Sequence, residues 1–478
     1  MTADAVLAID QGTSGTKAVV VDPADGVVGT AEVSLHPRYL ADGGVEQDPQ
    51  EMLDSVLSAG RAAVAQAGRP VGTVALANQG ETVLAWDRAS GRPLSPAIVW
   101  QDRRAAGICA ELDGHRELLH TRTGLVLDPY FSAPKMTWLR RNRTTEGVVT
   151  TTDSWLVHQL SGEFVTDPAT ASRSLVLDID RIDWDPELLE LFGLQDEALP
   201  RICDCDELVG TTSAFGAPMA VGGLIVDQQA ALLAEGCWTP GAAKCTFGTG
   251  AFLLANTGDR AVRSTAGLTS SVAWRTRELT QYCVDGQVYT AASAVRWLTD
   301  LGFIAGASEL DTVAANGSDG VLCVPALAGL AAPWWRPDAT ASFTGMTLAT
   351  GPGHLVRAVL EGIAAQVAEV ADVIADDLRQ PLGALRVDGG LTRSRTLMQA
   401  VADLTQLPVE LYPSPDATAL GAAALGRLAG QPGLALEQAV PDWTPVSRYE
   451  PVWTADRAAA FRQRWGALAA ATLPAKET

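Results

Sequence analysis

Two strand–turn–strand patterns, half a chain apart, constrain the fold of this sequence most. The first is AIDQGTSGTK at residues 8–17, followed by the apolar run Ala18–Val21. The second is KCTFGTGAFLL at residues 244–254. Apolar runs on both sides of a short turn of Gly, Thr and Ser predict a β-hairpin at each place. A single such turn is most often only a hairpin, but its recurrence predicts a duplicated domain.

The chemistry of these turns suits phosphate. Glycine lets the backbone approach a phosphate closely, and turn N–H and hydroxyl groups donate to its oxygens. Asp10 lies at the end of the first strand, where a carboxylate could hold a metal ion. The strand-to-helix phosphate loop G-x-x-x-x-G-K-[ST] does not occur in the sequence, and no G-x-G-x-x-G opens a helix. The two turns therefore indicate an enzyme that clamps ATP between two hairpins.

Two further segments carry candidate chemistry. Asp227 follows the apolar run 221–226 and precedes Gln228. An aspartate in this position can cap the next helix, and it can also act as the base that takes a proton from an attacking hydroxyl; both interpretations remain open. The segment LRVDGGLTRS at residues 385–394 predicts a strand that ends in a close-approach glycine turn before a helix.

Composition excludes several classes of function. A net charge of −21 disfavours a broad basic surface for nucleic acid or an anionic membrane. No apolar run reaches the roughly 18 residues of a membrane span, and no basic region precedes an apolar core at the N-terminus, as a signal peptide requires. The odd count of seven cysteines, without zinc spacing, predicts free thiols in a cytoplasmic protein.

The 478 residues are enough for two or three domains. Strands and helices alternate through both halves, which predicts an α/β fold with mixed sheets flanked by helices. Turn residues at 236–241 suggest a division into an N-terminal domain, 1–236, and a C-terminal domain, 237–478. Apolar periodicity predicts helices over 50–67, 353–378, 417–428 and 455–471.

Taken together and in order, the two hairpins, the Asp-Gln-Gln segment at 227–229 and the Asp-Gly-Gly segment at 388–390 resemble the FGGY family of carbohydrate kinases. Residues 130–142 and 341–361 resemble diagnostic patterns of that family, so the resemblance covers about 6–428. It implies two actin-like (ribonuclease H-like) ATPase domains, ATP and Mg²⁺, a homodimer, a substrate-binding N-terminal domain and a nucleotide-binding C-terminal domain.

Within the family, the glycerol-kinase-like branch is the most similar, and the matching positions imply roles for named residues. Asp227 would be the general base and Asp10 would orient the metal. The substrate would contact Gly80, Glu81, Trp100, Tyr130, Asp227, Gln228 and Phe252. The nucleotide would contact Gly12, Thr13, Ser14, Lys17, Thr249, Gly250, Gly389, Gly390 and Ser394.

The first substrate loop departs from the branch. It reads Asn-Gln-Gly-Glu-Thr at residues 78–82, where glycerol kinases are expected to have arginine in place of Gly80. A guanidinium that grips two hydroxyls has no equivalent in glycine. We therefore expect that Gly80 leaves room for a four-carbon polyol or a longer substrate, with Arg103 or Arg104 as substitute donors. A pentulose kinase and a non-catalytic actin-like ATP-binding protein are the alternatives.

Overall fold

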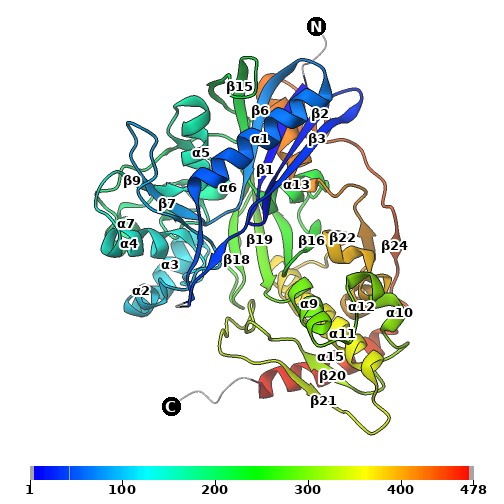
Figure 1. Ribbon diagram of the computed structural model, residues 1–478. Coiled ribbons are helices and arrows are strands. Elements are labelled where there is room, and N and C mark those ends of the chain that lie inside the picture. Colours follow the sequence, from blue (N-terminus) through cyan, green and yellow to red (C-terminus); the bar gives the residue numbers. More distant parts are fainter. Residues whose placement is uncertain (1–4, 42, 473–478) are drawn as a thin grey trace.

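The computed structural model describes residues 5–41 and 43–472, and it contains two large mixed sheets (Figure 1). The first sheet has six strands. In spatial order they are β14 (Leu208–Thr212), β15 (Met219–Val226), β6 (Val71–Asn78), β1 (Ala5–Gln11), β2 (Gly15–Asp22) and β3 (Gly26–Ser34).

The second sheet has seven strands. In spatial order they are β18 (Thr269–Arg275), β19 (Thr280–Val288), β17 (Ala251–Gly258), β16 (Ala243–Phe247), β22 (Leu385–Asp388), β23 (Val409–Leu411) and β24 (Arg448–Tyr449).

The two sheets share one pairing pattern. In the first, β1 pairs antiparallel with β2 and parallel with β6, which pairs parallel with β15. In the second, β16 pairs antiparallel with β17 and parallel with β22, which pairs parallel with β23. The turns at 12–14 and 248–250 therefore occupy equivalent places. Both predicted hairpins are confirmed, as is their repetition.

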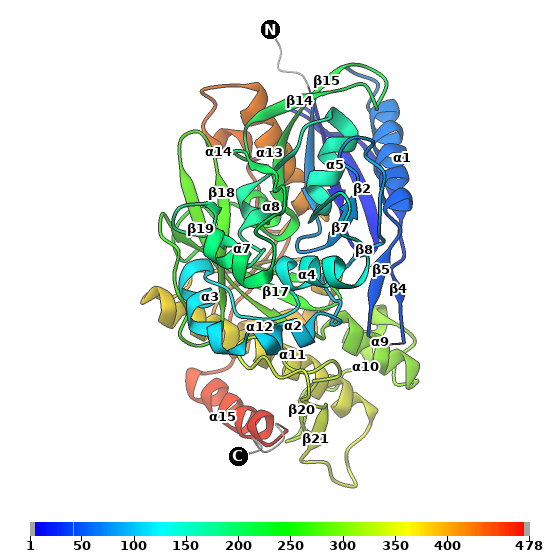
Figure 2. The same cartoon turned by 90° about the vertical axis from the view of Figure 1, so that its left-hand side faces the viewer.

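Alternate residues of β1 explain how the first sheet is covered on both faces. Leu7 and Ile9 belong to a core shared with helix α1 (Pro49–Ala67), whereas Val6 and Ala8 belong to a core shared with α8 (Asp227–Ala234) and α13 (Ala417–Gly430). Figures 1 and 2 show α1 and α13 on opposite sides of the blue strands. Burial on both faces requires the continuous apolar runs seen in the sequence.

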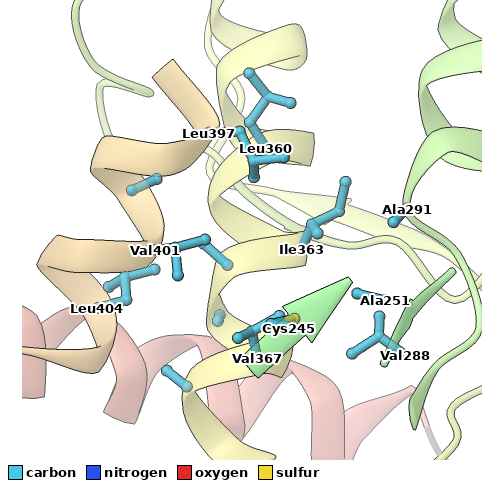
Figure 3. Close-up of a cluster of buried hydrophobic side chains, with 14 of the residues drawn as sticks. Cys245, Ala251, Val288, Ala291, Leu360, Ile363, Val367, Leu397, Val401 and Leu404 are labelled. Carbon is cyan, nitrogen blue, oxygen red and sulfur yellow. The ribbon is translucent and has the colours of Figure 1, made fainter. Parts of the chain in front are cut away.

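The second sheet packs against α11 (Pro352–Leu378) and α12 (Arg395–Thr405). Figure 3 shows Cys245, Ala251 and Val288 from the sheet facing Ile363 and Val367 of α11, with α12 beside that helix. The C-terminal helix α15 (Ala455–Ala471) adds buried Trp465, whose indole N–H donates to the carbonyl of Cys323.

Smaller elements complete the molecule. A five-stranded sheet runs β4 (Arg38–Tyr39), β5 (Val45–Gln47), β8 (Ala97–Ile98), β7 (Val83–Trp86) and β9 (Val148–Thr151). Two-stranded pairs are β10 (Val165–Thr166) with β13 (Arg201–Ile202), β11 (Leu177–Asp178) with β12 (Asp183–Trp184), and β20 (Leu322–Val324) with β21 (Ser342–Thr344).

The remaining α-helices are α2 (Ala106–Glu111), α3 (Arg116–Thr123), α4 (Ser132–Asn142), α5 (Thr152–Ser161), α6 (Pro168–Ala171), α7 (Pro186–Phe192), α9 (Ala292–Asp300), α10 (Leu310–Val313) and α14 (Leu436–Ala439). Within the described ranges, none of the helices combines the length and the apolar character needed to cross a membrane.

The predicted fold class is confirmed, and the four predicted helices lie within two residues of their expected bounds. The packing of helix α13 was not expected from the predicted division of the chain into two domains. It follows the second sheet in the chain but packs on α8 and on β15, β1 and β6 of the first sheet. The division at residues 236 and 237 stays a prediction, with packing that crosses it.

Candidate active site

The candidate site lies where parallel strands of the first sheet end. Asp10 of β1 is in register with Ala77 of β6, and Val226 of β15 is in register with Asn78. Asp227 directly follows Val226. Because parallel strands bring their carboxyl ends to one edge of the sheet, residues far apart in sequence meet there. The edge therefore gathers Asp10, Asp227 and the loop that contains Glu81.

Next to this edge, a small enclosed cavity of about 20 Å³ joins the two halves of the chain. Its floor comes from the first half and its opposite wall from β17 and β19. The residues that line this enclosed cavity are Glu81, Tyr130, Arg173, Val226, Asp227, Gln228, Gln229, Phe252, Leu254 and Asp285. Five of the predicted substrate residues thus share one space: Glu81, Tyr130, Asp227, Gln228 and Phe252.

Asp227 is the first residue of α8, with Val226 in the cap position. Its Oδ1 accepts the backbone N–H of Gln228 at 2.6 Å, which fixes the carboxyl at the start of the helix. Burial, followed by the negative charge of Glu81, raises the pKa of Asp227 to about 6. The interpretation of Asp227 as the helix cap is wrong, because Val226 is the cap residue and Asp227 is the first residue inside the helix. The pKa of the Asp227 carboxyl suits a general base near neutral pH.

The elevated pKa of Asp227 predicts an acid limb in the activity. A general base works only as the carboxylate, so log kcat/KM for the acceptor substrate should be flat above pH 6 and fall toward one unit per pH unit below it. The measurement is initial ADP release from pH 4.5 to 8, with the coupling enzymes doubled at each pH to show that they do not limit the rate. A profile still flat at pH 5 would contradict this assignment.

Two other acidic groups share the neighbourhood of Asp227. Burial and then the charge of Asp227 raise the pKa of Asp10 to about 7. Burial also raises the pKa of Glu81, although the charge of Arg173 acts in the opposite direction. The site thus concentrates negative charge and balances it with a small number of buried cations.

Lys244 is one of those cations. It lies fully buried on β16, and its Nζ donates to Gln228 Oε1 at 2.6 Å and to Thr246 Oγ1 at 2.7 Å. The contact holds the Gln228 amide beside Asp227, and the ammonium charge opposes the rise of the Asp227 pKa. Lys244 of the second hairpin therefore holds in place a side chain, Gln228, that lines the enclosed cavity.

A larger, open cavity of about 370 Å³ adjoins the enclosed one. Trp100, Tyr130 and Phe252 form its aromatic wall, with edge-to-face ring contacts of 5.5 Å and 6.0 Å from Trp100 to Tyr130 and Phe252. Thr249 and Gly250 of the second turn also line it, as do Gln101, Arg103, Gln287, Val288, Tyr289, Ala328 and Pro337. The predicted substrate wall and the second phosphate turn thus face one space.

The first turn connects to this wall through Thr13. The indole N–H of Trp100 donates to Thr13 Oγ1 at 2.9 Å, and that hydroxyl donates to Gln79 Oε1 at 2.9 Å. The hydroxyl is therefore engaged within the protein, and a phosphate contact from Thr13 would use its backbone N–H. Lys17 forms an ion pair with Asp416, the residue before α13.

The predicted nucleotide residues of the C-terminal half occupy turns. Gly389 has φ of 92°, and a Cβ there would lie 2.5 Å from the carbonyl oxygen of Phe247, so the turn needs glycine. Gly390 begins a short 3₁₀ turn. Ser394 caps α12 by accepting the N–H of Leu397, and its hydroxyl hydrogen-bonds to Asp311.

The lining of the two cavities does not include Asp10 or Gly80, nor the predicted nucleotide residues Gly12, Thr13, Ser14, Lys17, Gly389, Gly390 and Ser394. Their roles stay predictions.

Comparison with known proteins now identifies the class. The model of the N-terminal domain of the FGGY family of carbohydrate kinases matches residues 5–234, and that of the C-terminal domain matches residues 243–430. The chain belongs to the FGGY family of carbohydrate kinases. Membership makes it an ATP-dependent carbohydrate kinase in place of the non-catalytic alternative, and ATP is its co-substrate.

Relatives and solved structures agree with this FGGY assignment. A glycerol kinase of Alkalilimnicola ehrlichii is 44% identical, with 93% of this chain and 95% of that protein covered. A glycerol kinase of Aromatoleum aromaticum is 41% identical, covering 96% and 97%. The crystal structure of Plasmodium falciparum glycerol kinase with ADP superposes with a TM-score of 0.91 at 30% identity, covering 99% of each chain. These matches also bear out the actin-like fold.

A xyloylose kinase from Brucella ovis has a TM-score of 0.87 at 26% identity, covering 97% of this chain and 98% of that one. Solved structures named as a glycerol kinase and as a xyloylose kinase thus share this architecture.

The room that Gly80 was expected to leave for a longer substrate stays a prediction. A Cβ at this position would lie 2.8 Å from Val226 Cγ2, so the space directly beside the backbone is narrow. The larger space lies in the open cavity, which Arg103 and Gln287 line.

Of the two expected substitute donors, the structure contradicts Arg104 and leaves Arg103 a prediction. Arg104 pairs with Asp102 and Glu46 and lines neither cavity. Arg103 lines the open cavity, but it pairs with Asp128. The guanidinium beside Glu81 belongs to Arg173, which the sequence interpretation missed. A signal existed, since Arg173 is the sole charged residue in the segment 168–177.

Proposed function

We propose that this kinase transfers the γ-phosphoryl group of ATP to a terminal hydroxyl of a small polyol, with glycerol as the first candidate and a four-carbon polyol as the next. The observation that carries this proposal is the enclosed cavity, in which the carboxyl of Asp227 lies beside Glu81, Tyr130 and Gln228. The glycerol kinase relatives support a short acceptor.

In the proposed reaction, Glu81, Tyr130 and Gln228 hydrogen-bond the polyol, while Trp100 and Phe252 pack against its carbon skeleton. The acceptor hydroxyl gives its proton to the Asp227 carboxylate as its oxygen bonds to the γ-phosphorus. The bond from the γ-phosphorus to the bridging oxygen breaks, and ADP leaves. Backbone groups of Gly12, Thr13 and Ser14 with Lys17 serve the γ-phosphate, and Thr249, Gly250, Gly389, Gly390 and Ser394 serve the remainder of the nucleotide.

Asp10 fits a divalent cation held through water. Its carboxyl is destabilised by burial and by the charge of Asp227, a repulsion that a cation would relieve. No group of three or more His, Cys, Asp or Glu able to hold a metal occurs within 5–41 and 43–472, which suits Mg²⁺, since it keeps several waters and few protein ligands. Bound Mg²⁺ would neutralise charge on the ATP phosphates.

We further infer a cytoplasmic homodimer. All seven cysteines are buried and unpaired, and burial raises the pKa of the Cys109, Cys237 and Cys283 thiols to about 12. Unreactive, reduced thiols suit a reducing compartment. The homodimer rests on the family resemblance.

A substrate panel tests the acceptor. We expect the highest kcat/KM on glycerol in an ADP-release assay against glycerol, erythritol, D- and L-threitol, dihydroxyacetone, xylulose and ribulose. Asp227→Asn supplies the background rate. Turnover confined to the four- and five-carbon compounds would mean that the acceptor extends into the open cavity and that glycerol is the wrong substrate. The pentulose alternative would then lead.

A further inference from the structure

Arg173 holds a central position in the enclosed cavity. It follows α6, and its side chain is 6% exposed. Nε donates to Glu81 Oε1 at 2.5 Å, and Nη1 donates to Asp285 Oδ1 at 2.6 Å. Glu81 belongs to the first substrate loop and Asp285 to β19 of the second sheet. The guanidinium therefore bridges the two halves at the acceptor site.

The bridge leaves one nitrogen unused. Among the described residues, Arg173 Nη2 has no hydrogen-bond partner, although Arg173 lines the enclosed cavity. Two carboxylates orient the planar fork, and the guanidinium carbon lies 5.7 Å from the ring centroid of Tyr130. A guanidinium fixed on two sides has a donor in a defined direction, ready for a hydroxyl.

Position 80, next to Glu81, has no side chain that could donate to a substrate, because it is glycine. A Cβ there would lie 2.8 Å from Val226 Cγ2. The cavity carboxyls of Glu81, Asp227 and Asp285 accept hydrogen bonds when ionised. A polyol, whose hydroxyls both donate and accept, also needs donors. The Tyr130 hydroxyl and the Gln228 amide line the same cavity, and Arg173 adds a charged donor to them.

We propose that Arg173 is the substrate-binding guanidinium of this kinase, donating from Nη2 to an acceptor hydroxyl other than the one phosphorylated. The inference rests on the proposed polyol kinase function and adds a specificity residue to it. Glu81 and Asp285 hold the guanidinium in place, and Arg173 reaches the loop of Gly80 and Glu81 from a position 93 residues after Gly80 in the chain.

The test compares Arg173→Lys with Arg104→Lys. Arg104 is equally buried and pairs with two carboxylates, but it lies outside both cavities. Lysine keeps the charge and loses the planar fork. Arg173→Lys should raise the KM for glycerol about 10- to 100-fold, the range for a lost hydrogen bond to a charged donor. Arg104→Lys should leave it within about twofold.

Substrate analogues separate binding from a structural effect. Propane-1,2-diol and propane-1,3-diol each lack one glycerol hydroxyl. We compare the increase in KM caused by Arg173→Lys for glycerol and for each diol, as in a double-mutant cycle. The increase should vanish for the diol that lacks the contacted hydroxyl and persist for the other diol. An equal penalty on all three substrates, or an unchanged KM for glycerol, would overturn the inference.

Two controls distinguish the possible failures. Calorimetric binding of ATP should be unchanged in Arg173→Lys, because the residue faces the acceptor. The melting temperature should fall by about as much as in Arg104→Lys, which also loses a buried fork between two carboxylates. Loss of ATP binding would mean that Arg173 only holds the halves together. If the unaltered enzyme turns over none of the polyols, the proposed function fails and this inference with it. If it turns over glycerol and Arg173→Lys behaves as the unaltered enzyme does, this inference alone fails.

Discussion

Asp227→Asn should lower kcat about 10²- to 10⁴-fold, the usual contribution of a general base. Asparagine has nearly the same shape, and its side-chain oxygen can still accept the N–H of Gln228 that Asp227 accepts at 2.6 Å. The start of α8 should therefore survive, and ATP should bind as before. The measurement is kcat from ADP release at saturating acceptor and ATP, with ATP affinity from calorimetry.

A matched control is Asp48→Asn. Asp48 caps α1 by accepting the N–H of Gln50 at 2.8 Å, so the same change occurs at another helix start, away from the site. Asparagine caps helices about as well as aspartate, and kcat should stay unchanged. If Asp227→Asn retained kcat within about threefold of the unaltered enzyme, Asp227 could not be the base, and the proton would have to leave by another route.

Gly421→Ala should destabilise the protein strongly. A Cβ at residue 421 of α13 would lie 1.9 Å from the carbonyl oxygen of Ala230 in α8, a backbone atom that cannot rotate away. The two helices must separate to admit the methyl group, and overpacking of this kind costs about 1–3 kcal/mol or more. Because α8 carries Asp227 and Gln228, activity should fall together with thermal stability.

Gly466→Ala is the comparison. Gly466 lies in α15, and a Cβ there would meet nothing within 4 Å. Alanine favours a helix interior over glycine by up to about 1 kcal/mol, so this variant should melt at the same temperature or higher. Melting curves of both variants, recorded at equal concentration, decide the matter; equal midpoints would show that α13 does not pack on α8 as described.

Much of the fold could be predicted because its signals are local. The turns at 12–14 and 248–250 are marked by Gly and Thr between apolar runs, and both hairpins form there. The helix predicted over 455–471 has those bounds in the structure, where Thr454 caps it by accepting the N–H of Arg457. Such periodicity and capping act over a few residues, so the sequence alone carries them.

The candidate site was predictable only in part. Asp10 and Asp227 could be found because each follows an apolar strand, and the parallel pairing of β1, β6 and β15 brings their ends together. The sequence could not show how closely Val226 approaches Gly80, because this contact joins segments that are far apart in the chain.

The amino-acid sequence is sufficient to assign the class, through its paired hairpins, its duplicated α/β fold and the order of motifs of an FGGY kinase. Which cation lies beside Glu81 and which helix packs on α8 follow only from the packing of distant segments. Arg173 meets Glu81 across 92 residues and Asp285 across 112, and α13 reaches back to α8. Contacts of such separation depend on how the sheets pack together, and no local pattern encodes them.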